Sequence, residues 1–153
     1  MLLRMVHRTT LDVRFNEIDP YGHVNHAIYV TYFEVGRTDA LTACGLPLEE
    51  MARRGYQLVV THIDVRFRGA ATAGDRLVVE TSLGALRRAR GTWHQRILRP
   101  AAAGDGGTGG GGEDGEGDVL VTAEITAGVT DRAGRPTRPP DWLFPALERL
   151  RVG

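Results

Sequence analysis

The sequence predicts an α+β protein in which an antiparallel sheet packs against one principal helix. Two observations carry this prediction: a helix-length apolar stretch from His26 to about Ala43, and five segments of strand-like composition separated by turn residues. A chain of 153 residues is long enough to bury a core without disulfides or metals, and we expect residues 1–153 to form a single domain.

The first strand is expected at Thr9–Phe15, where apolar and polar residues alternate. The helix is expected to begin near His26. Its first half is rich in β-branched and aromatic residues, so periodicity alone leaves a strand possible there. The length of the stretch and the Gly45-Leu46-Pro47 stop favour a helix. A short second helix is expected at Pro47–Arg54.

Four further strands are expected to follow in a meander-like succession, at Tyr56–Phe67, Asp75–Leu83, Gly91–Leu98 and Val119–Thr130. Each is rich in Val, Ile, Leu or Thr, and turn residues such as Gly69–Gly74 and Gly84–Arg90 separate them. A last short helix is expected at Asp141–Arg149, after two prolines.

The stretch from about 101 to 118 is acidic, rich in glycine and almost without apolar side chains. Such a composition cannot pack into a core, so we expect a disordered loop inserted in a hairpin. Because strands on both sides are needed for one sheet, the insertion does not divide the chain into two domains.

The composition excludes several classes of function. The formal net charge is zero, so the overall charge does not indicate nucleic acid or a membrane surface as a partner. All 19 basic residues are Arg, and the lack of Lys excludes Schiff-base chemistry and a phosphate-loop lysine.

Neither a metal nor a redox cofactor is expected. Cys44 is the only cysteine, and His62 and His94 lie on expected strands without further ligands at metal-binding spacing. No apolar run is long enough to span a bilayer, and the apolar stretch at the N-terminus is too short for a secretory signal, so a cytoplasmic protein is expected.

The most informative segment surrounds Asp19, a carboxylate placed just before the expected helix. Pro20 favours an extended backbone at Asp19, and Gly22 permits a tight turn with positive φ. With Asn25 as helix N-cap, the N–H groups of residues 26–28 would lack helical partners and could polarise a carbonyl oxygen. Asp19 could attack the carbonyl carbon or activate water. The simpler alternative is that Asp19 only shapes the turn.

The motif Asp19-Pro20-x-Gly22-His23-Val24-Asn25, followed by Tyr29, Tyr32-Phe33-Glu34 and Arg37, resembles the signature of hotdog-fold acyl-CoA thioesterases of the 4-hydroxybenzoyl-CoA thioesterase type. The resemblance continues through Cys44-Gly45-Leu46-Pro47, Val65-Arg66-Phe67 and Gly74-Asp75-Arg76-Leu77. It covers nearly the whole chain apart from the glycine-rich insertion and the C-terminal stretch.

This resemblance implies a five-stranded sheet wrapped around one long helix, and Asp19 as the catalytic nucleophile or general base. It also implies that the backbone N–H of His26 polarises the thioester oxygen and that Gly22 lets the thioester approach closely. No cofactor is implied. Proteins of this family form homodimers or homotetramers with the site at a subunit interface, so the same is expected here.

Three polar residues near Asp19 have two possible roles each. His23 is expected either to bind substrate or to shape the turn, and Asn25 either to orient water or to cap the helix. The hydroxyl of Tyr29 is expected either to line the acyl pocket or to pack in the core. Glu34 and Arg37, three residues apart, are interpreted as a structural ion pair on the helix surface.

Arg87, Arg88 and Arg90 cluster at an expected turn between strands. Solvated turn charges are one interpretation. In related thioesterases a basic cluster at this turn contacts the phosphates of coenzyme A, and guanidinium groups suit phosphate. The same residues could bind an acidic carrier protein.

The predicted function is hydrolysis of an acyl-CoA or acyl-carrier-protein thioester to the free acid and thiol. Two alternatives stay open: a hotdog hydratase or dehydratase acting on enoyl or 3-hydroxyacyl thioesters, with His23 or His26 as base, and a non-catalytic acyl-CoA sensor. The acyl group itself is not predicted.

Overall fold

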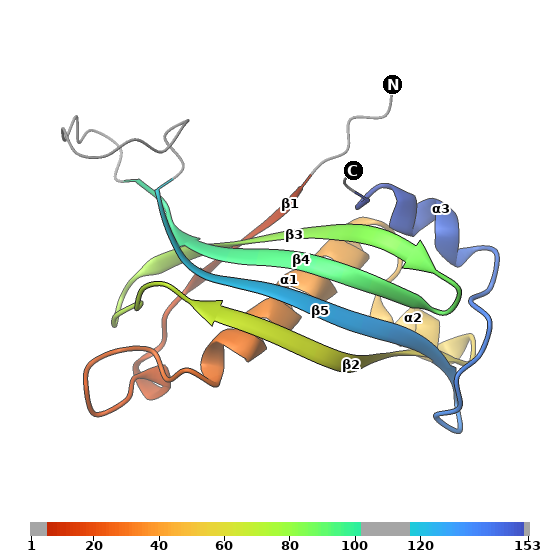
Figure 1. Ribbon diagram of the computed structural model, residues 1–153, viewed down its shortest axis with the longest axis horizontal. Coiled ribbons are helices and arrows are strands. Elements are labelled where there is room, and N and C mark those ends of the chain that lie inside the picture. The colour runs from red at the N-terminus through yellow and green to blue at the C-terminus, as the bar shows by residue number, and fades with distance from the viewer. Residues whose placement is uncertain (1–5, 102–116, 152–153) are drawn as a thin grey trace.

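The computed structural model describes residues 6–101 and 117–151 (Figure 1). Its strands are β1 (His7–Asp12), β2 (Tyr56–Phe67), β3 (Arg76–Arg87), β4 (Arg90–Arg99) and β5 (Asp118–Asp131). Its helices are the 3-10 turn η1 (Phe15–Glu17), the long α1 (Ile28–Ala43), and the short α2 (Leu48–Arg53) and α3 (Leu143–Glu148). The inserted glycine-rich stretch, predicted to be a disordered loop, lies almost entirely outside the described residues.

The five strands form one antiparallel sheet in the order β1-β3-β4-β5-β2. The expected meander is therefore wrong for β2, which pairs with β5 and not with β3. Between β1 and β2 the chain runs through α1, which crosses one face of the sheet, so β2 joins the opposite edge. Only β3, β4 and β5 follow one another as neighbours.

Two boundaries near Asp19 differ from the expectation. The first strand ends at Asp12, because the backbone N–H of Arg14 donates to the Glu17 carboxylate at 2.7 Å and η1 follows. Phe15, expected inside that strand, is 91% exposed. The long helix begins at Ile28, two residues later than expected.

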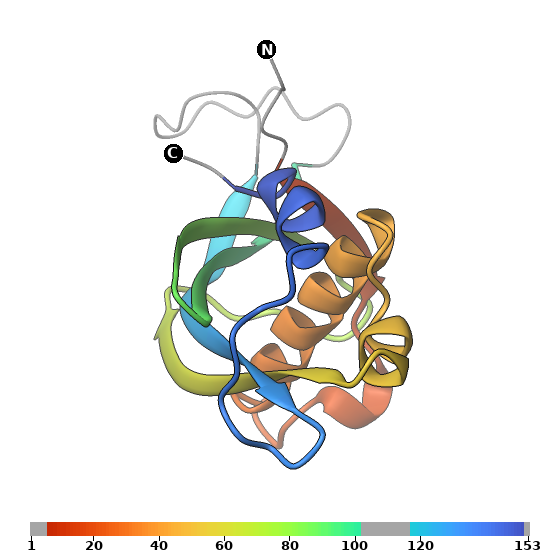
Figure 2. The same ribbon diagram turned by 90° about the vertical axis from the view of Figure 1, so that its right-hand side faces the viewer.

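Helix α1 lies against the concave face of the sheet, which curls around it (Figure 2). The face of α1 turned to the sheet is buried, including Tyr29, Tyr32, Phe33, Ala40 and Leu41. Leu77, Val79, Ile97, Val121 and Ile125 meet it from the strands. This burial of apolar surface is the main stabilising contribution to the fold.

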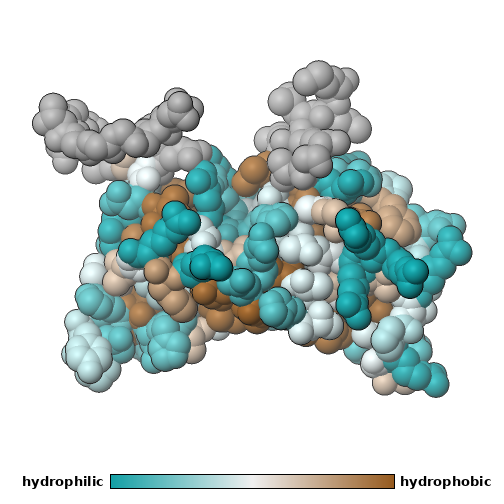
Figure 3. All heavy atoms as spheres, viewed as in Figure 1, coloured by the Kyte–Doolittle hydropathy of each residue, from teal (hydrophilic) through white to brown (hydrophobic). Residues whose placement is uncertain are grey.

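Hydrophilic side chains are spread over the opposite face of the sheet (Figure 3). On the edge strand β2, the apolar residues Val59, Val60 and Ile63 are each 39% exposed, and Phe67 is 53% exposed. None of the helices in the described part of the chain is long and apolar enough to cross a lipid bilayer.

Candidate active site

The loop that carries Asp19 folds back on itself at the start of α1. The Asp19 N–H donates to the His23 carbonyl at 2.8 Å, and the Asn25 N–H donates to the Glu17 carbonyl at 2.9 Å. Residues 17–19 therefore run antiparallel to residues 23–25. This pairing places the carboxylate of Asp19 on the same small loop as the entrance to the helix.

The two oxygens of the Asp19 carboxylate have different surroundings. Oδ1 accepts the N–H groups of Tyr21 at 2.8 Å and His23 at 3.2 Å, whereas no described residue donates to Oδ2. Gly22 has φ +81°, as the sequence predicts, and a side chain there would meet no atom, so the requirement is conformational. The carboxylate thus shapes the turn through one oxygen and keeps the other available for chemistry.

The entrance to α1 offers a backbone donor that no described residue binds. Asn25 accepts the Ala27 N–H on Oδ1 at 3.0 Å and the Ile28 N–H on its carbonyl at 2.9 Å. Asn25 was expected to be the N-cap, but the N-cap is Ala27. Of the three N–H groups expected to be free, only that of His26 has no partner among the described residues, because Asn25 occupies the other two.

Two tyrosines on α1 hold this loop against the helix. The Tyr32 hydroxyl donates to Glu17 Oε1 at 2.8 Å, and the Tyr29 hydroxyl accepts the Ala71 N–H at 2.9 Å. Ala71 in turn accepts the Val24 N–H at 2.9 Å. Burial, together with the hydrogen bond to Glu17, raises the pKa of Tyr32 well above its usual range, so its hydroxyl is a neutral donor.

The other residues predicted near Asp19 take part mainly in this framework. His23 is exposed and pairs through its backbone, which fits the turn-shaping role. Tyr29 is 3% exposed, which fits core packing. The contacts of His23, Asn25 and Tyr29 with substrate stay predictions. Glu17 was not singled out from the sequence, and Tyr32 was named only as part of the motif, because a bond across 15 positions leaves no local pattern.

The interpretation of Glu34 and Arg37 as an ion pair is wrong. Arg37 turns toward the sheet and donates from Nη1 to Gln95 Oε1 at 2.9 Å, and no ion pair joins it to Glu34 in the described part of the chain. The partner Gln95 lies on β4, far away in sequence. Spacing of three on a helix permits such a pair but does not require it.

Arg87, Arg88 and Arg90 lie at the far end of the sheet from Asp19. His23 bridges to Thr72, just before β3, whereas the arginines surround the β3–β4 turn. The 12 residues of β3 span roughly 36 Å. Figure 1 shows the loop after β1 and this hairpin at opposite ends of the molecule. One protomer therefore does not bring these arginines to Asp19.

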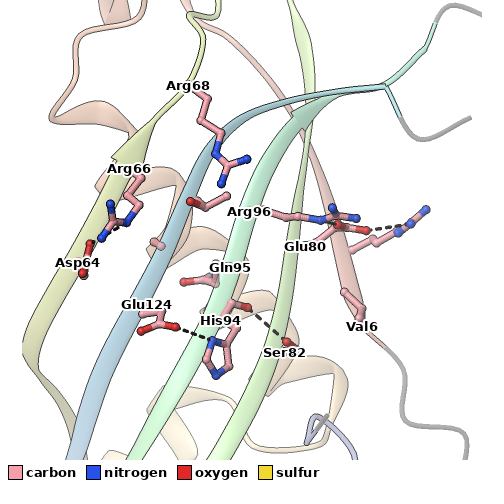
Figure 4. A pocket seen from close by; sticks show the side chains of 13 residues that line it. Val6, Asp64, Arg66, Arg68, Glu80, Ser82, His94, Gln95, Arg96 and Glu124 are labelled. Carbon is pink, nitrogen blue, oxygen red and sulfur yellow. Dashed lines mark hydrogen bonds and ion pairs between the residues drawn. The ribbon is translucent and has the colours of Figure 1, made fainter. Parts of the chain in front are cut away.

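A cavity of about 650 Å³ lies on the outer face of the sheet and not beside Asp19. Its charges are largely compensated within the face: Arg96 bonds Glu80, and Arg66 lies 3.9 Å from Asp64 (Figure 4). The sheet separates it from α1, so we do not assign it the chemistry. In the described part of the chain, no three His, Cys, Asp or Glu side chains gather to hold a metal ion.

Comparison with known proteins points to one family. The sequence pattern of the thioesterase-like superfamily matches residues 13–147. A long-chain acyl-CoA thioesterase of Escherichia coli (strain K12), FadM, is 30% identical over 120 residues, which cover 78% of this chain and 79% of the relative. A chloroplastic acyl-acyl carrier protein thioesterase of Arabidopsis thaliana, ATL2, is 28% identical over 134 residues, or 88% of this chain. The chain spans 64% of that relative and 44% of a second Arabidopsis thioesterase, ATL3.

A solved structure shows the same architecture. The crystal structure of a probable thioesterase from Bartonella henselae has a TM-score of 0.74 and 28% identity, covering 89% of this chain and 100% of that chain. With the sheet curled around α1, this likeness confirms the predicted hotdog fold. The matched pattern and the similarity to FadM show that this chain belongs to the thioesterase-like superfamily.

Proposed function

We propose that this protein hydrolyses acyl-CoA or acyl-carrier-protein thioesters to the free acid and thiol. The observation that carries the proposal is the pairing, on one loop, of an Asp19 Oδ2 that no described residue binds with a His26 N–H that is likewise unbound. The first is a base or nucleophile, and the second is a donor for the oxyanion.

The reaction follows from these two groups. The thioester oxygen accepts the His26 N–H, which stabilises the negative charge that forms on it. As a general base, Asp19 Oδ2 takes a proton from water while the hydroxide forms a bond to the carbonyl carbon. The carbon–sulfur bond then breaks, and the thiolate takes the proton from Asp19. As a nucleophile, Oδ2 would instead displace the thiolate and form an anhydride that water hydrolyses.

The relatives support this reaction, but they act on different thioesters and so do not specify one acyl group. FadM is a long-chain acyl-CoA thioesterase, and ATL2 is an acyl-acyl carrier protein thioesterase. Both are thioesters of a phosphopantetheine thiol. We therefore propose the reaction and the thiol carrier class, and not the 4-hydroxybenzoyl substrate.

We further propose that two protomers build the complete site, through the unpaired edge of β2. An apolar edge strand left exposed is a template for pairing with another chain. Arg87, Arg88 and Arg90 lie about one strand length from Asp19 in a single protomer, so they could reach a substrate bound at Asp19 only from a neighbouring copy. On that arrangement the three guanidinium groups would hold phosphates or an acidic carrier.

The test is thiol release from a panel of aromatic, short-chain, medium-chain and long-chain acyl-CoA and acyl-carrier-protein thioesters. Wild type should release thiol from at least one class, and Asp19→Asn from none at a comparable rate. His26→Pro, which deletes the N–H, should lose on the order of 100-fold in kcat. Water addition to an enoyl-CoA without thiol release, or tight binding without turnover, would overturn the proposal.

A single turnover in ¹⁸O-labelled water tests for a covalent role of Asp19. A covalent anhydride attacked at the Asp19 carbon places the label in the carboxylate of Asp19, where peptide mass spectrometry detects it. General-base catalysis and an anhydride attacked at the acyl carbon both place the label only in the released acid, so label in Asp19 is the outcome that identifies the nucleophile.

A further inference from the structure

Arg37 is a cation turned inward without a carboxylate bound to it. Its Nη1 donates to Gln95 Oε1 at 2.9 Å, and no ion pair is formed by Arg37 in the described part of the chain. Burial lowers the pKa of its guanidinium, and the negative charge of Glu34 opposes this shift. A guanidinium carries five N–H donors, and the Gln95 oxygen accepts from one of its nitrogens. Every buried side-chain nitrogen and oxygen in the described part of the chain has a partner, so the remaining donors of Arg37 face accessible space and can bind a further acceptor.

The position of Arg37 is fixed by Gln95, which is itself firmly held. Gln95 is 4% exposed, and its Nε2 donates to Thr81 Oγ1 and to the Phe33 carbonyl, each at 2.9 Å. Gly36 brings α1 so close to the sheet that a Cβ there would lie 2.6 Å from Val79 and 3.1 Å from Gln95 Nε2. The Gln95 side chain that orients Arg37 is therefore held by two elements, α1 and β3, besides the strand β4 that carries it.

Arg37 borders a cavity of about 340 Å³ between α1 and β2. Its walls are largely apolar, and its polar side chains come from α1: Glu34, Arg37 and Thr38. The apolar lining includes Leu41, Leu48, Leu58 and Trp93. No described residue bonds the Glu34 carboxylate. The cavity thus offers an apolar surface with one strong donor and one strong acceptor on the same helix.

We propose that this cavity receives the acyl chain of the substrate and selects chains that carry a hydroxyl group along their length. A hydroxyl oxygen accepts from Arg37, and its O–H donates to Glu34. A keto oxygen satisfies Arg37 alone, and a carboxylate is repelled by Glu34. The proposal rests on the proposed thioesterase function, and adds the class of acyl group.

The position of the cavity along α1 sets where the hydroxyl should lie. From His26 to Arg37 the helix advances roughly 16 Å. The side chain of Arg37 leans back toward the N-terminus and shortens this span. The thioester carbon sits at His26, so the selected oxygen lies well along the chain and not next to the thioester.

The test compares kcat/KM for thiol release from a saturated acyl-CoA with that for derivatives of the same length. These carry a hydroxyl at successive positions, a keto group, or a terminal carboxylate. Wild type should prefer one mid-chain hydroxy isomer over the plain chain by about tenfold, as expected for one hydrogen bond to a charged group. Arg37→Met should abolish this preference. Glu34→Gln should reduce the preference for the hydroxylated chain. It should leave the ratio of kcat/KM for the keto chain to that for the plain chain unchanged, because a keto oxygen bonds only Arg37.

Controls separate selection from folding. Arg54 stacks 4.5 Å from the ring centroid of Trp142, outside the cavity, so Arg54→Met should keep the wild-type preference. Melting temperatures identify a variant that fails to fold. Calorimetric binding of the free hydroxy acid and the plain acid to Asp19→Asn measures the same selectivity without turnover.

Equal kcat/KM for plain and hydroxylated chains in wild type would overturn the proposal, as would a uniform loss on every substrate in Arg37→Met. Absence of thiol release from every substrate would refute the thioesterase function instead. In that case, selective binding of the hydroxy acid would still support selection of hydroxylated chains by the cavity. Equal binding of the two acids would contradict that selection.

Discussion

The chemistry proposed for Asp19 depends on two tyrosines that hold its loop in place. Tyr29 and Tyr32, nearly one turn apart on α1, bond the two segments that flank the loop: Ala71 on one side and Glu17 on the other. Their rings meet edge to face, with centroids 6.0 Å apart. These bonds fix the loop to the start of α1, next to the His26 N–H. An oxyanion site requires such pre-organisation.

Tyr32→Phe tests this restraint, because it deletes the bond to Glu17 and keeps the ring. We expect a loss of about 1–3 kcal/mol in the free energy of unfolding, and a fall in kcat larger than the change in KM. Urea denaturation and thiol release measure the two effects. Tyr21→Phe is the matched control, since Tyr21 is 85% exposed and its hydroxyl has no described partner. Equal behaviour of both variants would contradict the restraint.

The local part of the site could be predicted from the sequence, and the long-range part could not. The positive φ of Gly22 and the free N–H of His26 both follow from a turn placed just before a helix. The roles of Glu17 and Gln95 depend on bonds to residues 15 and 58 positions away. Such bonds are set by how the helix packs on the sheet, which spacing along the chain does not encode.

At the scale of the elements, α1 approaches β3 and β4 very closely. Gly36 lies at this crossing, where Val79, Thr81 and Gln95 leave no room for a Cβ atom. The missing side chain lets the helix backbone approach the buried polar group of Gln95. Helix interiors disfavour glycine, so its presence here is explained by packing and not by helix propensity.

Gly36→Ala should destabilise the protein by about 1–3 kcal/mol, because overpacking outweighs the gain in helix propensity. Thr31→Ala, on the exposed side of the same helix, should be neutral or slightly stabilising. Thermal unfolding of both variants checks the result. A stabilised Gly36→Ala protein would show that the crossing relaxes freely.

The hydrogen bonds that join β1 to α1 should make the stability of the protein depend on pH. Asp39 Oδ2 is 2.7 Å from both His7 Nε2 and Thr9 Oγ1, and these hydrogen bonds, His7 first, lower the pKa of Asp39. A depressed pKa contributes stability that is present above the unfolded value of about 3.9 and is lost as the pH falls through the folded value. The stability difference between wild type and Asp39→Asn should therefore shrink below about pH 4 in urea titrations. A pH-independent difference would contradict this role.

The sequence located the strands but did not predict how β2 pairs in the sheet. Composition and turn residues located the strands closely, and β2 matches its expected bounds, Tyr56–Phe67. The pairing of β2 with β5 does not follow from composition, because an edge strand and a neighbour in a meander have the same residue preferences. It follows from α1, which carries the chain across the sheet before β2 begins.

For the whole molecule, the exposed apolar residues of β2 and the separation of the arginine turn from Asp19 both point to a second copy. Among the described strands, β2 has a neighbour on one side only, and it carries the exposed residues Val59, Val60 and Ile63. Pairing there would extend the sheet and bury these side chains.

Ile63→Glu should shift the protein toward monomer in light scattering coupled to gel filtration, and thiol release should fall with it. A buried, unpaired carboxylate in such an interface is strongly unfavourable. Val6→Glu is the matched control: Val6 is 40% exposed, close to the 39% of Ile63, and precedes β1 at the opposite edge. A monomeric wild type with full activity would contradict the proposed assembly.

We propose that Asp19 acts through its side chain and His26 through its backbone. Thiol release measured side by side for wild type, Asp19→Asn and His26→Ala tests these two roles. We expect Asp19→Asn to lose about 100-fold to 10,000-fold in kcat, whereas His26→Ala, which keeps the N–H, should stay within a few-fold of wild type. Equal losses in the two variants would contradict these roles.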